Sequence, residues 1–452
     1  MLDRGSIAIT TKTDPQTVAE RILEQASAFA DEAEVFHVTS ASTPVHFEAN
    51  RLKAVDSNDA AGAALRIIKD GRVGFAYTSN LGQLEDLVGA ALETAPFGAE
   101  AKFSFPAAAE YPDVPVFDAA VEEVTLEEMS ALGQRVIDEL RAFSDEVQVE
   151  GGVSRSTSTL TLLNSNGGHF SYSRSGFRVG FEGTVIRGED MLFTFDGKSG
   201  VHPITDPSDV VASIKRQLSW AKELTTVETK PMRVILMPTA VSSILLNPLL
   251  AGLSGKTVLQ GTSPLAERMG ETIVDERFTL TDDATLPYVP ASRMSDDEGI
   301  PTRRLPLVDH GKVATFLYDL QTAGLAGVQS TGSGERGLSS LPGPSAGVLL
   351  VSEGDTSLEE MIADMSEGLI VEALLGAGQG NVLGGDFNAN VLLGYKVQDG
   401  KVVGRVKNTM VSGNVYKALS NLVAIGSEGR WMRGGLYAPP IALADISVSA
   451  NG

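Results

Sequence analysis

The C-terminal part of the chain contains the run Gly380-Asn381-Val382-Leu383-Gly384-Gly385-Asp386-Phe387-Asn388. Two apolar stretches, 391–397 and 402–406, follow it on either side of the dipeptide Asp399-Gly400. An Asp-Gly pair between two strand-like runs predicts a hairpin with a two-residue turn. The segment closes with Val411-Ser412-Gly413-Asn414-Val415 and Ala424-Ile425-Gly426. Turn glycines between short apolar runs predict a strand-rich domain with antiparallel pairing.

The N-terminal part predicts a helix, four strands and a second helix. Asp14-Pro15 is an N-cap followed by proline at the first helical position, so a helix is expected from there to about Ala30. Lys69-Asp70-Gly71-Arg72 predicts a tight hairpin turn. The expected strands span 33–39, 44–49, 61–68 and 73–78, and the closing helix spans 81–94.

The same order of elements is expected a second time after a proline-spaced linker. Thr125-Leu126-Glu127-Glu128 is a capping-box pattern for a helix ending near Phe143. A second capped helix is expected from Asp206-Pro207 to about Leu224. Between them, strands are expected at 146–154, 157–163, 168–174 and 177–187, with a turn at Asn166-Gly167.

These patterns predict an α+β fold with two N-terminal α-ββββ-α units, each with an antiparallel sheet, and a larger strand-rich C-terminal domain with short helices. In the third part, a hairpin is expected from strands 304–308 and 312–317, and Thr356-Ser357 is expected to cap a short helix. The expected divisions are 1–104 for the first unit, 105–117 for a linker, 118–228 for the second unit and 229–452 for the C-terminal domain.

Composition excludes several classes of function. The formal charge of −22 repels phosphate backbones, and no basic stretch offsets it, so nucleic-acid binding is not expected. The chain contains no cysteine, which excludes disulfides, thiol catalysis and thiolate metal ligands. The start, Met1 to Ser6, has no apolar core of a signal peptide. The nearly uncharged run 234–253 contains Pro238 and Pro248 and predicts a buried strand and helix rather than a membrane span. The expected compartment is the cytoplasm.

Several ordered segments resemble the TldD/TldE family, whose TldE branch is also called PmbA or "modulator of DNA gyrase" and is grouped with U62-type peptidases. Besides the C-terminal run, the resemblance covers the hairpin 64–79 and the segments Asp297-Glu298-Gly299-Ile300-Pro301-Thr302-Arg303 and Ser330-Thr331-Gly332-Ser333-Gly334-Glu335-Arg336. The resemblance implies a two-member system in which one member carries a zinc peptidase site.

In the peptidase member, the zinc site resembles His-Glu-x-x-x-His on a helix of the third domain, with a cysteine nearer the C-terminus. Such spacing places both imidazoles on one helical face beside a glutamate that can activate zinc-bound water. The resemblance places Asn247, Pro248 and Gly252 in the corresponding positions of this chain, and none of them can bind zinc or act as a base. No His-Glu-x-x-x-His occurs elsewhere in the sequence.

Other candidate ligands are scattered. No two of the five histidines have close ligand spacing; they are His37, His46, His169, His202 and His310. His37 and His46 could meet across a pair of strands, but half-exposed structural roles are expected for them. Asp296-Asp297-Glu298 could hold calcium or magnesium, although the run lacks the spacing of a dedicated loop and is expected to be a solvated turn.

The leading hypothesis is a TldE/PmbA-type subunit without a catalytic residue, metal or cofactor of its own. The resemblance implies a TldD-type partner that carries the zinc and acts in cytoplasmic proteolysis of small or unfolded peptides. One alternative is a self-sufficient hydrolase that uses Asp386 or the acidic run 296–298; another is a homodimer that binds peptides as a modulator. An apolar group could form the contact between subunits or pack a terminal strand: Trp431, Met432, Leu436 and Tyr437.

Overall fold

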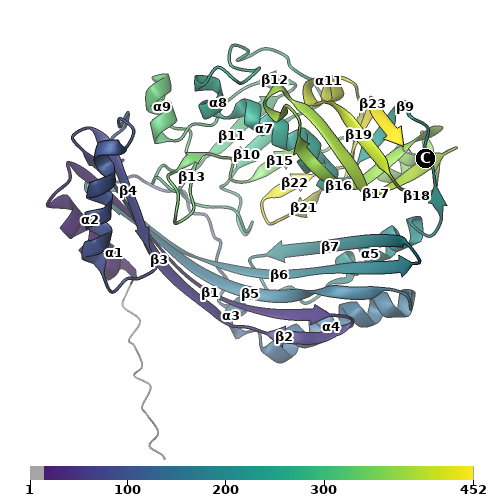
Figure 1. Cartoon of the computed structure of the whole chain (residues 1–452), viewed down its shortest axis with the longest axis horizontal. Helices are drawn as coiled ribbons and strands as arrows, with labels where there is room; N and C mark the ends of the chain where they lie inside the picture. The colour runs from purple at the N-terminus through teal and green to yellow at the C-terminus, as the bar shows by residue number, and fades with distance from the viewer. Residues whose placement is uncertain (1–14, 451–452) are drawn as a thin grey trace, which may run out of the picture.

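The computed structural model describes residues 15–450. Two layers make up the molecule (Figure 1): a curved N-terminal sheet of long strands lies beneath a C-terminal part that contains two larger sheets and one two-stranded sheet. Helices cover the outer face of the N-terminal sheet, and its inner face is turned toward the C-terminal part. The expected α+β class is confirmed.

Both N-terminal units contribute strands to one antiparallel sheet. The seven strands have the order β4-β3-β1-β5-β6-β7, with β2 paired to β1. Their bounds are β1 Glu32–Glu48, β2 Arg51–Val55, β3 Asn58–Lys69, β4 Arg72–Thr78, β5 Gln148–Asn164, β6 His169–Arg187 and β7 Asp190–Gly200. The two units are therefore joined edge to edge through the β1–β5 pairing.

The expected strand bounds were too short in this sheet. Three pairs of expected fragments are single strands, β1, β5 and β6, and β7 was not expected at all. The sequence shows breaks where runs such as Ser154 to Ser158 are polar, but the backbone ladder continues through them. Backbone hydrogen bonds form whatever the polarity of the side chains. Every second residue of these strands faces the inner side of the sheet and is not packed in a core, so polar residues are accepted there without a break in the strand.

Helices pack on the outer face of the sheet in two groups. The first group is α1 Pro15–Ser27 and α2 Leu84–Thr94, followed by the 3₁₀ turn η1 Ala95–Phe97; the second is α3 Ala120–Glu123, α4 Leu126–Phe143 and α5 Ser208–Trp220. Ile22 and Leu87 pack with Leu65 and Ile67 of β3, whereas Ile137 packs in a separate core. The expected capping box at Thr125 is confirmed, and the expected cap at Asp14 lies outside the described residues.

The C-terminal part contains an eight-stranded and a six-stranded sheet. The first has the order β16-β9-β23-β19-β17-β18-β8, with β20 paired to β23, and an additional β16–β17 pairing closes five of its strands into a ring. Its strands are β8 Leu224–Thr225, β9 Lys230–Leu236, β16 Glu367–Gln379, β17 Asp386–Gln398, β18 Lys401–Val406, β19 Thr409–Asn414, β20 Leu422–Ile425 and β23 Ile441–Ala450.

The six-stranded sheet lies beside this ring, and both lie above the N-terminal sheet (Figure 1). Its order is β12-β11-β10-β15-β22-β21, and its strands are β10 Leu280–Asp283, β11 Arg304–Asp309, β12 Lys312–Val313, β15 Leu349–Val351, β21 Arg430–Met432 and β22 Leu436–Ala438. A separate short pair joins β13 Gly334–Glu335 and β14 Gly343–Pro344.

Short helices connect these strands. They are α6 Pro238–Ala240, the π-turn η2 Val241–Leu246, α7 Asn247–Leu253, α8 Gly255–Leu259, α9 Leu320–Ala326, α10 Leu358–Ala363, the 3₁₀ turn η3 Val382–Gly384 and α11 Val415–Ser420. The run 234–253 is thus the end of β9 and a broken helix, as expected. Within residues 15–450, no helix combines the length and apolar character required to cross a membrane.

Three hairpins have the turns that the sequence predicts. Asp70-Gly71, His310-Gly311 and Asp399-Gly400 each have two consecutive residues with positive φ. This conformation matches the twist of the flanking strands and favours glycine at the second position. Local turn chemistry therefore sets the register of β3–β4, β11–β12 and β17–β18.

Candidate functional site

The helix expected to correspond to the zinc helix of the peptidase member is a broken run of three pieces, α6, η2 and α7. In the middle of it, the N–H of Asn247 donates to the carbonyl of Ser242, five residues earlier. Pro248 explains this wider turn, because proline has no N–H and its ring would clash with the carbonyl of Ile244 in a regular α-helix. The position expected to hold a general base therefore shapes the backbone instead.

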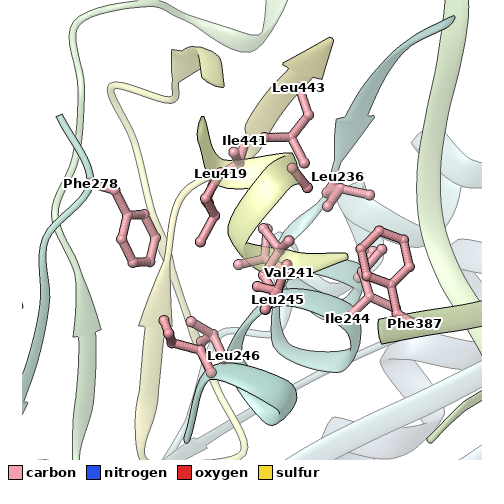
Figure 2. Close-up of a cluster of buried hydrophobic side chains, with 14 of the residues drawn as sticks. Leu236, Val241, Ile244, Leu245, Leu246, Phe278, Phe387, Leu419, Ile441 and Leu443 are labelled. Carbon is pink, nitrogen blue, oxygen red and sulfur yellow. The ribbon is translucent and has the colours of Figure 1, made fainter. Parts of the chain in front are cut away.

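Apolar side chains surround this helix. Figure 2 shows Val241, Ile244 and Leu245 of the π-turn in a cluster with Phe387 and Leu419, and all five are buried. A zinc ligand on this face would need a polar second shell to orient it. The packed hydrocarbon of this face offers none.

Direct geometry shows that the three expected positions do not fit a zinc ion. Asn247 is exposed, and Pro248 and Gly252 are buried. A Cβ atom built on Gly252 would lie 2.5 Å from the hydroxyl of Tyr416 and 3.3 Å from Cδ1 of Leu265. Tyr416 therefore occupies the space that an imidazole at position 252 would need. Among residues 15–450, no group of three or more His, Cys, Asp or Glu side chains is arranged to hold a metal ion.

Tyr416 itself is unusual in this position. Its hydroxyl is buried and has no hydrogen-bond partner among the described residues. Burial raises the pKa of Tyr416 to about 12, so the hydroxyl is neutral near pH 7. A neutral phenol without a partner fills space here and supplies no charge for chemistry.

Asp386, the alternative catalytic carboxylate, is the first residue of β17. It is exposed, and its Oδ1 accepts a hydrogen bond of 2.9 Å from Nδ2 of Asn414. It is not among the residues that line the cleft of about 770 Å³ between the two layers. The side-chain contact of Asp386 is with the Asn414 amide and not with a second acid or a nucleophile.

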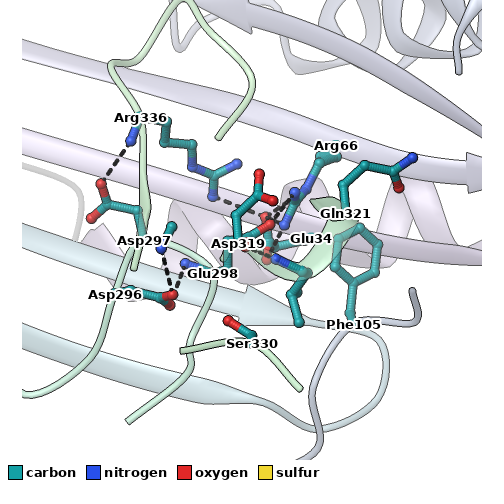
Figure 3. Close-up of polar contacts among 12 residues, drawn as sticks. Glu34, Arg66, Phe105, Asp296, Asp297, Glu298, Asp319, Gln321, Ser330 and Arg336 are labelled. Atoms are coloured by element: carbon teal, nitrogen blue, oxygen red, sulfur yellow. Dashed lines mark hydrogen bonds and ion pairs between the residues drawn. The ribbon is translucent and has the colours of Figure 1, made fainter. Parts of the chain in front are cut away.

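The acidic run 296–298 is not a solvated turn, and that expectation was wrong. Asp296 and Glu298 have no exposed surface and Asp297 retains 7%. Figure 3 shows that distant arginines and backbone amides surround the run. Oδ1 of Asp296 accepts from the amides of Glu298 and Ile300, and Oδ2 accepts from Gly334. The carboxylates are buried because the fold supplies donors from other segments.

Arginines connect this run to the N-terminal sheet. Nη1 of Arg66, on β3, donates to Oε1 of Glu298 at 2.6 Å, while its Nε and Nη2 donate to Glu34 on β1 at 3.2 and 3.1 Å. Nη2 of Arg336 lies 2.9 Å from Oε1 of Glu34. We call these four residues, with Asp296 and Asp297, the buried ionic network. It clamps the inner face of the sheet to the C-terminal part.

Burial shifts the titration of this network. Burial raises the pKa of Glu298 to about 7, with Asp296 and Asp319 adding to the rise and Arg66 opposing it. Burial likewise raises the pKa of Asp296 to about 6, against the hydrogen bonds from backbone amides. For Arg66, burial lowers the pKa, but Glu34 and Glu298 more than offset this effect and keep it charged. Near neutral pH, Glu298 is thus partly protonated while Arg66 stays charged.

The histidines do not form a site. His37 and His46 are on the same strand, β1, rather than on paired strands, and they cannot meet. His37 is buried with both ring nitrogens unpartnered among the described residues, and burial lowers its pKa. His46 is about half exposed beside Asp56. His202 and His310 each contact one aspartate, and His169 is exposed. The half-exposed role expected for His37 was therefore wrong.

A cleft of about 770 Å³ lies between the inner face of the N-terminal sheet and the C-terminal part. We call it the central cleft. Its wall from the C-terminal part includes Met237 and Thr239 at the start of the broken helix, together with Trp431, Met432 and Leu436. Three of the four residues expected at a subunit contact thus line a cleft within one chain. The fourth, Tyr437, contacts the carboxylate of Glu353 through its hydroxyl.

Two ion pairs involve residues that line the central cleft, namely Asp196, Glu372 and Arg430. Arg430 contacts Oδ2 of Asp196 at 2.8 Å, and Arg216 donates to both carboxylate oxygens of Glu372 at 2.9 and 3.2 Å. Burial raises the pKa of Glu372, although Arg216 opposes the rise. These four charged residues lie on three strands and on helix α5, far apart in the sequence, so analysis of the sequence missed them.

Two paired glycines, Gly180 on β6 and Gly197 on β7, form part of the floor of the cleft. Gly152 on β5 pairs with Gly180 and continues the row beyond the lining residues. Glycines aligned across a sheet remove side chains from one patch and allow a ligand backbone to approach closely. This row of glycines is the signal that could have located the cleft. Recognising that the glycines are neighbours requires the strand register, which cannot be read from the sequence alone.

Comparison with known proteins agrees with this architecture. Residues 33–95, 120–222 and 229–450 match domain 1, the central domain and the C-terminal domain of PmbA/TldA metallopeptidases. Together the three matches cover most of the chain, including both layers of the fold.

Individual relatives and one solved structure are similar over nearly the whole length. An uncharacterized protein of Methanocaldococcus jannaschii is 26% identical, covering 93% of this chain and 97% of its own length. A metalloprotease of Methanothermobacter thermautotrophicus is 24% identical over 87% of each chain. The crystal structure of TldE from Thermococcus kodakarensis has a TM-score of 0.87 with 24% identity, covering 96% of this chain and all of that one. The last likeness shows the fold.

Proposed function

The chain belongs to the PmbA/TldD metallopeptidase family, and on that premise we propose that it is a non-catalytic, TldE-type subunit. Its partner is a TldD-type subunit that carries zinc, and the pair acts in the cytoplasm on small or unfolded peptides. This chain contributes a wall of the peptide chamber and stabilises the active partner.

The geometry at Gly252 carries the proposal. A metal helix needs two side chains on one face, and here one position is exposed asparagine while the other has the Tyr416 hydroxyl in the space of a side chain. Substitution of a single residue would not rebuild the site, because the π-turn at Pro248 also changes the direction of the following side chains. Both the backbone at the π-turn and the side chains at positions 247, 248 and 252 are therefore unsuited to a zinc site.

The central cleft supports a role in holding peptides. Its volume of about 770 Å³ is in the range of ligand pockets, and it combines Trp431 and Met432 with charged groups of both signs. The glycine row leaves backbone accessible on the floor, which suits an extended peptide. β7 and β21 are edge strands of their sheets, and each contributes residues to the cleft.

Elemental analysis and activity of the purified chain test the proposal. We expect no stoichiometric zinc and no hydrolysis of unstructured peptides by the chain alone. Co-expression with a homologue that bears His-Glu-x-x-x-His should yield a stable one-to-one complex with activity. Tightly bound zinc together with peptidase activity in the isolated chain would refute the proposal.

A homodimeric peptide-binding modulator is the second candidate, because the central cleft is complete within one chain. Solution mass separates the two: a two-fold homodimer that excludes the zinc-bearing homologue favours the modulator. The self-sufficient hydrolase is less well supported, since Asp386 binds Asn414 and the acidic run is buried in the ionic network.

A further inference from the structure

A second, smaller cavity of about 170 Å³ opens on the same inner face of the N-terminal sheet. Its walls come from β1, β5, β6 and the segment 293–336 of the C-terminal part. The lining residues are Val38, Ser158, Leu160, Tyr172, Arg174, Arg293, Asp297, Glu335 and Arg336. We call it the arginine cavity, because three guanidinium groups converge on it.

The three guanidinium groups have unused hydrogen-bond donors. Nη2 of Arg174 donates to the hydroxyl of Tyr172 at 2.9 Å and to the carbonyl of Ser292 at 3.0 Å, but its Nε is buried without a partner. Nε of Arg293 is also unpartnered within residues 15–450, and its Nη1 lies 3.8 Å from Oδ2 of Asp297. The Arg293 side chain is only 8% exposed.

Arg336 is the most deeply buried of the three, with no exposed side-chain surface. It has one ion pair, to Glu34, but none of its side-chain nitrogens makes a hydrogen bond of good geometry to a described residue. Burial lowers the pKa of Arg336 even though Glu34 opposes the change. A buried cation whose neighbours do not fully compensate it favours an additional anion.

The unpartnered donors, rather than an excess of charge, favour an acceptor of low charge. The lining contains three arginines and two carboxylates, Asp297 and Glu335, while Glu34 pairs with Arg336 from outside the lining. A doubly charged phosphate would be repelled by these carboxylates more strongly than a singly charged carboxylate, which also matches the planar fork of a guanidinium. Val38 and Leu160 provide an apolar wall beside the arginines.

We propose that the arginine cavity binds the carboxylate group of a small organic acid or of a peptide C-terminus. The volume equals about five or six water molecules at ~30 Å³ each, which fits a carboxylate with a few carbon atoms. The unused N–H groups of Arg293 and Arg336 hold the two oxygens, and the apolar wall contacts the adjoining carbons.

Its location connects the arginine cavity with the central cleft. Arg174 in the cavity and Arg178 in the cleft lie on β6, on the same face and four residues apart, about 13 Å along the strand. A short extended peptide anchored by its C-terminus would therefore reach the cleft. This link to peptides rests on the proposed function; binding of a carboxylate does not.

Titration calorimetry on the purified chain tests the inference with four probes. These are isovalerate, inorganic phosphate, an acetylated tetra-alanine with a free C-terminus and the same peptide with a C-terminal amide. We expect the free-acid peptide to bind at least about 10-fold more tightly than its amide, since a charge-assisted hydrogen bond is lost. Equal binding of the acid and amide peptides together with no binding of isovalerate, or tighter binding of phosphate than of both carboxylates, would overturn the proposal.

Comparison of the two acids identifies the source of the carboxylate. Tighter binding of the free-acid peptide than of isovalerate supports a peptide C-terminus. Equal or tighter binding of isovalerate supports a small free acid.

Variants locate the site. Arg293→Met keeps the side-chain stem and should weaken binding of the acids about 10-fold or more, whereas Arg187→Met, on the exposed end of the same sheet, should not change it. Glu335→Gln, at an exposed position, should tighten binding several-fold even if Arg293→Met folds poorly. Unchanged affinity in both cavity variants would place the binding elsewhere and reject the inference. Zinc content and peptidase activity do not enter these measurements, so their outcome is independent of the proposed function.

Discussion

Gly252 and Tyr416 pack against each other at the end of the broken helix 238–253. Gly252 lacks the side chain that a ligand would provide, and the hydroxyl of Tyr416 fills the resulting space. The hydroxyl has no hydrogen-bond partner among the described residues, so it contributes volume at the cost of desolvation. Gly252 and Tyr416 therefore fit together sterically: the tyrosine hydroxyl leaves no room for a side chain at position 252.

Gly252→Ala should destabilise the chain by about 1–3 kcal/mol, because the added methyl group overlaps with the Tyr416 hydroxyl in a packed region. Tyr416→Phe removes that hydroxyl and should be close to neutral by itself, since an unsatisfied polar group is lost. In the double variant the cost of Gly252→Ala should largely disappear. Chemical denaturation of the four proteins in a double-mutant cycle measures the coupling.

Gly89→Ala provides the matched control, since Gly89 lies in helix α2 with open space at its Cβ position. There, alanine should stabilise by up to about 1 kcal/mol through helix propensity. Additive effects of Gly252→Ala and Tyr416→Phe would show that the hydroxyl does not exclude a side chain.

At the scale of elements, local signals and long-range pairing act differently. Helix α4 begins where the sequence indicates, because Thr125 and Glu128 cap it through hydrogen bonds between neighbours in the chain. Strands β5 and β6 extend through serine-rich segments where the sequence pattern predicts breaks. They continue there because backbone hydrogen bonds to the neighbouring strands are formed whatever the side chains are. Helix starts are decided locally, while strand length is decided by the sheet.

Removal of the cap should therefore have a local and predictable cost. Thr125→Ala removes the acceptor for the amide of Glu128 and should lower the free energy of unfolding by about 1 kcal/mol. Thr125→Ser keeps the hydroxyl and should be close to wild type. Thermal or urea denaturation measures both, and equal losses in the two variants would show that the methyl group, not the cap, stabilises the helix.

At the scale of the whole molecule, the buried ionic network joins the two layers. Arg66 and Glu298 are 232 residues apart in sequence and 2.6 Å apart in space. Their pairing lies beside the arginine cavity, so the same interface that holds the layers together also shapes the proposed carboxylate site. A change in its charge state should be transmitted to overall stability.

Stability should fall as pH rises toward neutrality because of Glu298. Burial raises its pKa to about 7, above the ordinary value of 4.5, so between these values the folded chain binds more protons than the unfolded chain. This stabilising contribution is complete below about pH 4.5 and is lost as pH rises through about 7. The charged groups that face Glu298 are Arg66, Asp296 and Asp319.

Glu298→Gln keeps a neutral side chain at every pH and should remove this loss. The wild type should lose up to about 3 kcal/mol relative to the variant between pH 4.5 and 8. Urea denaturation across this range measures the difference, with Glu267→Gln, at an exposed position, as the control. A constant difference between wild type and Glu298→Gln would exclude the raised pKa.

The sequence alone determined the α+β class, the family, the hairpin turns at Asp70-Gly71 and Asp399-Gly400, and the absence of a His-Glu-x-x-x-His motif. These features depend on residue identity and on neighbours in the chain, so they can be recognised without a fold. Only the tertiary structure decided that Asp296 and Glu298 are buried, that His37 and His46 share one strand, and that Arg174, Arg293 and Arg336 converge on one cavity. The physical reason is that burial and charge compensation depend on partners far away in sequence, and strand register brings those partners together.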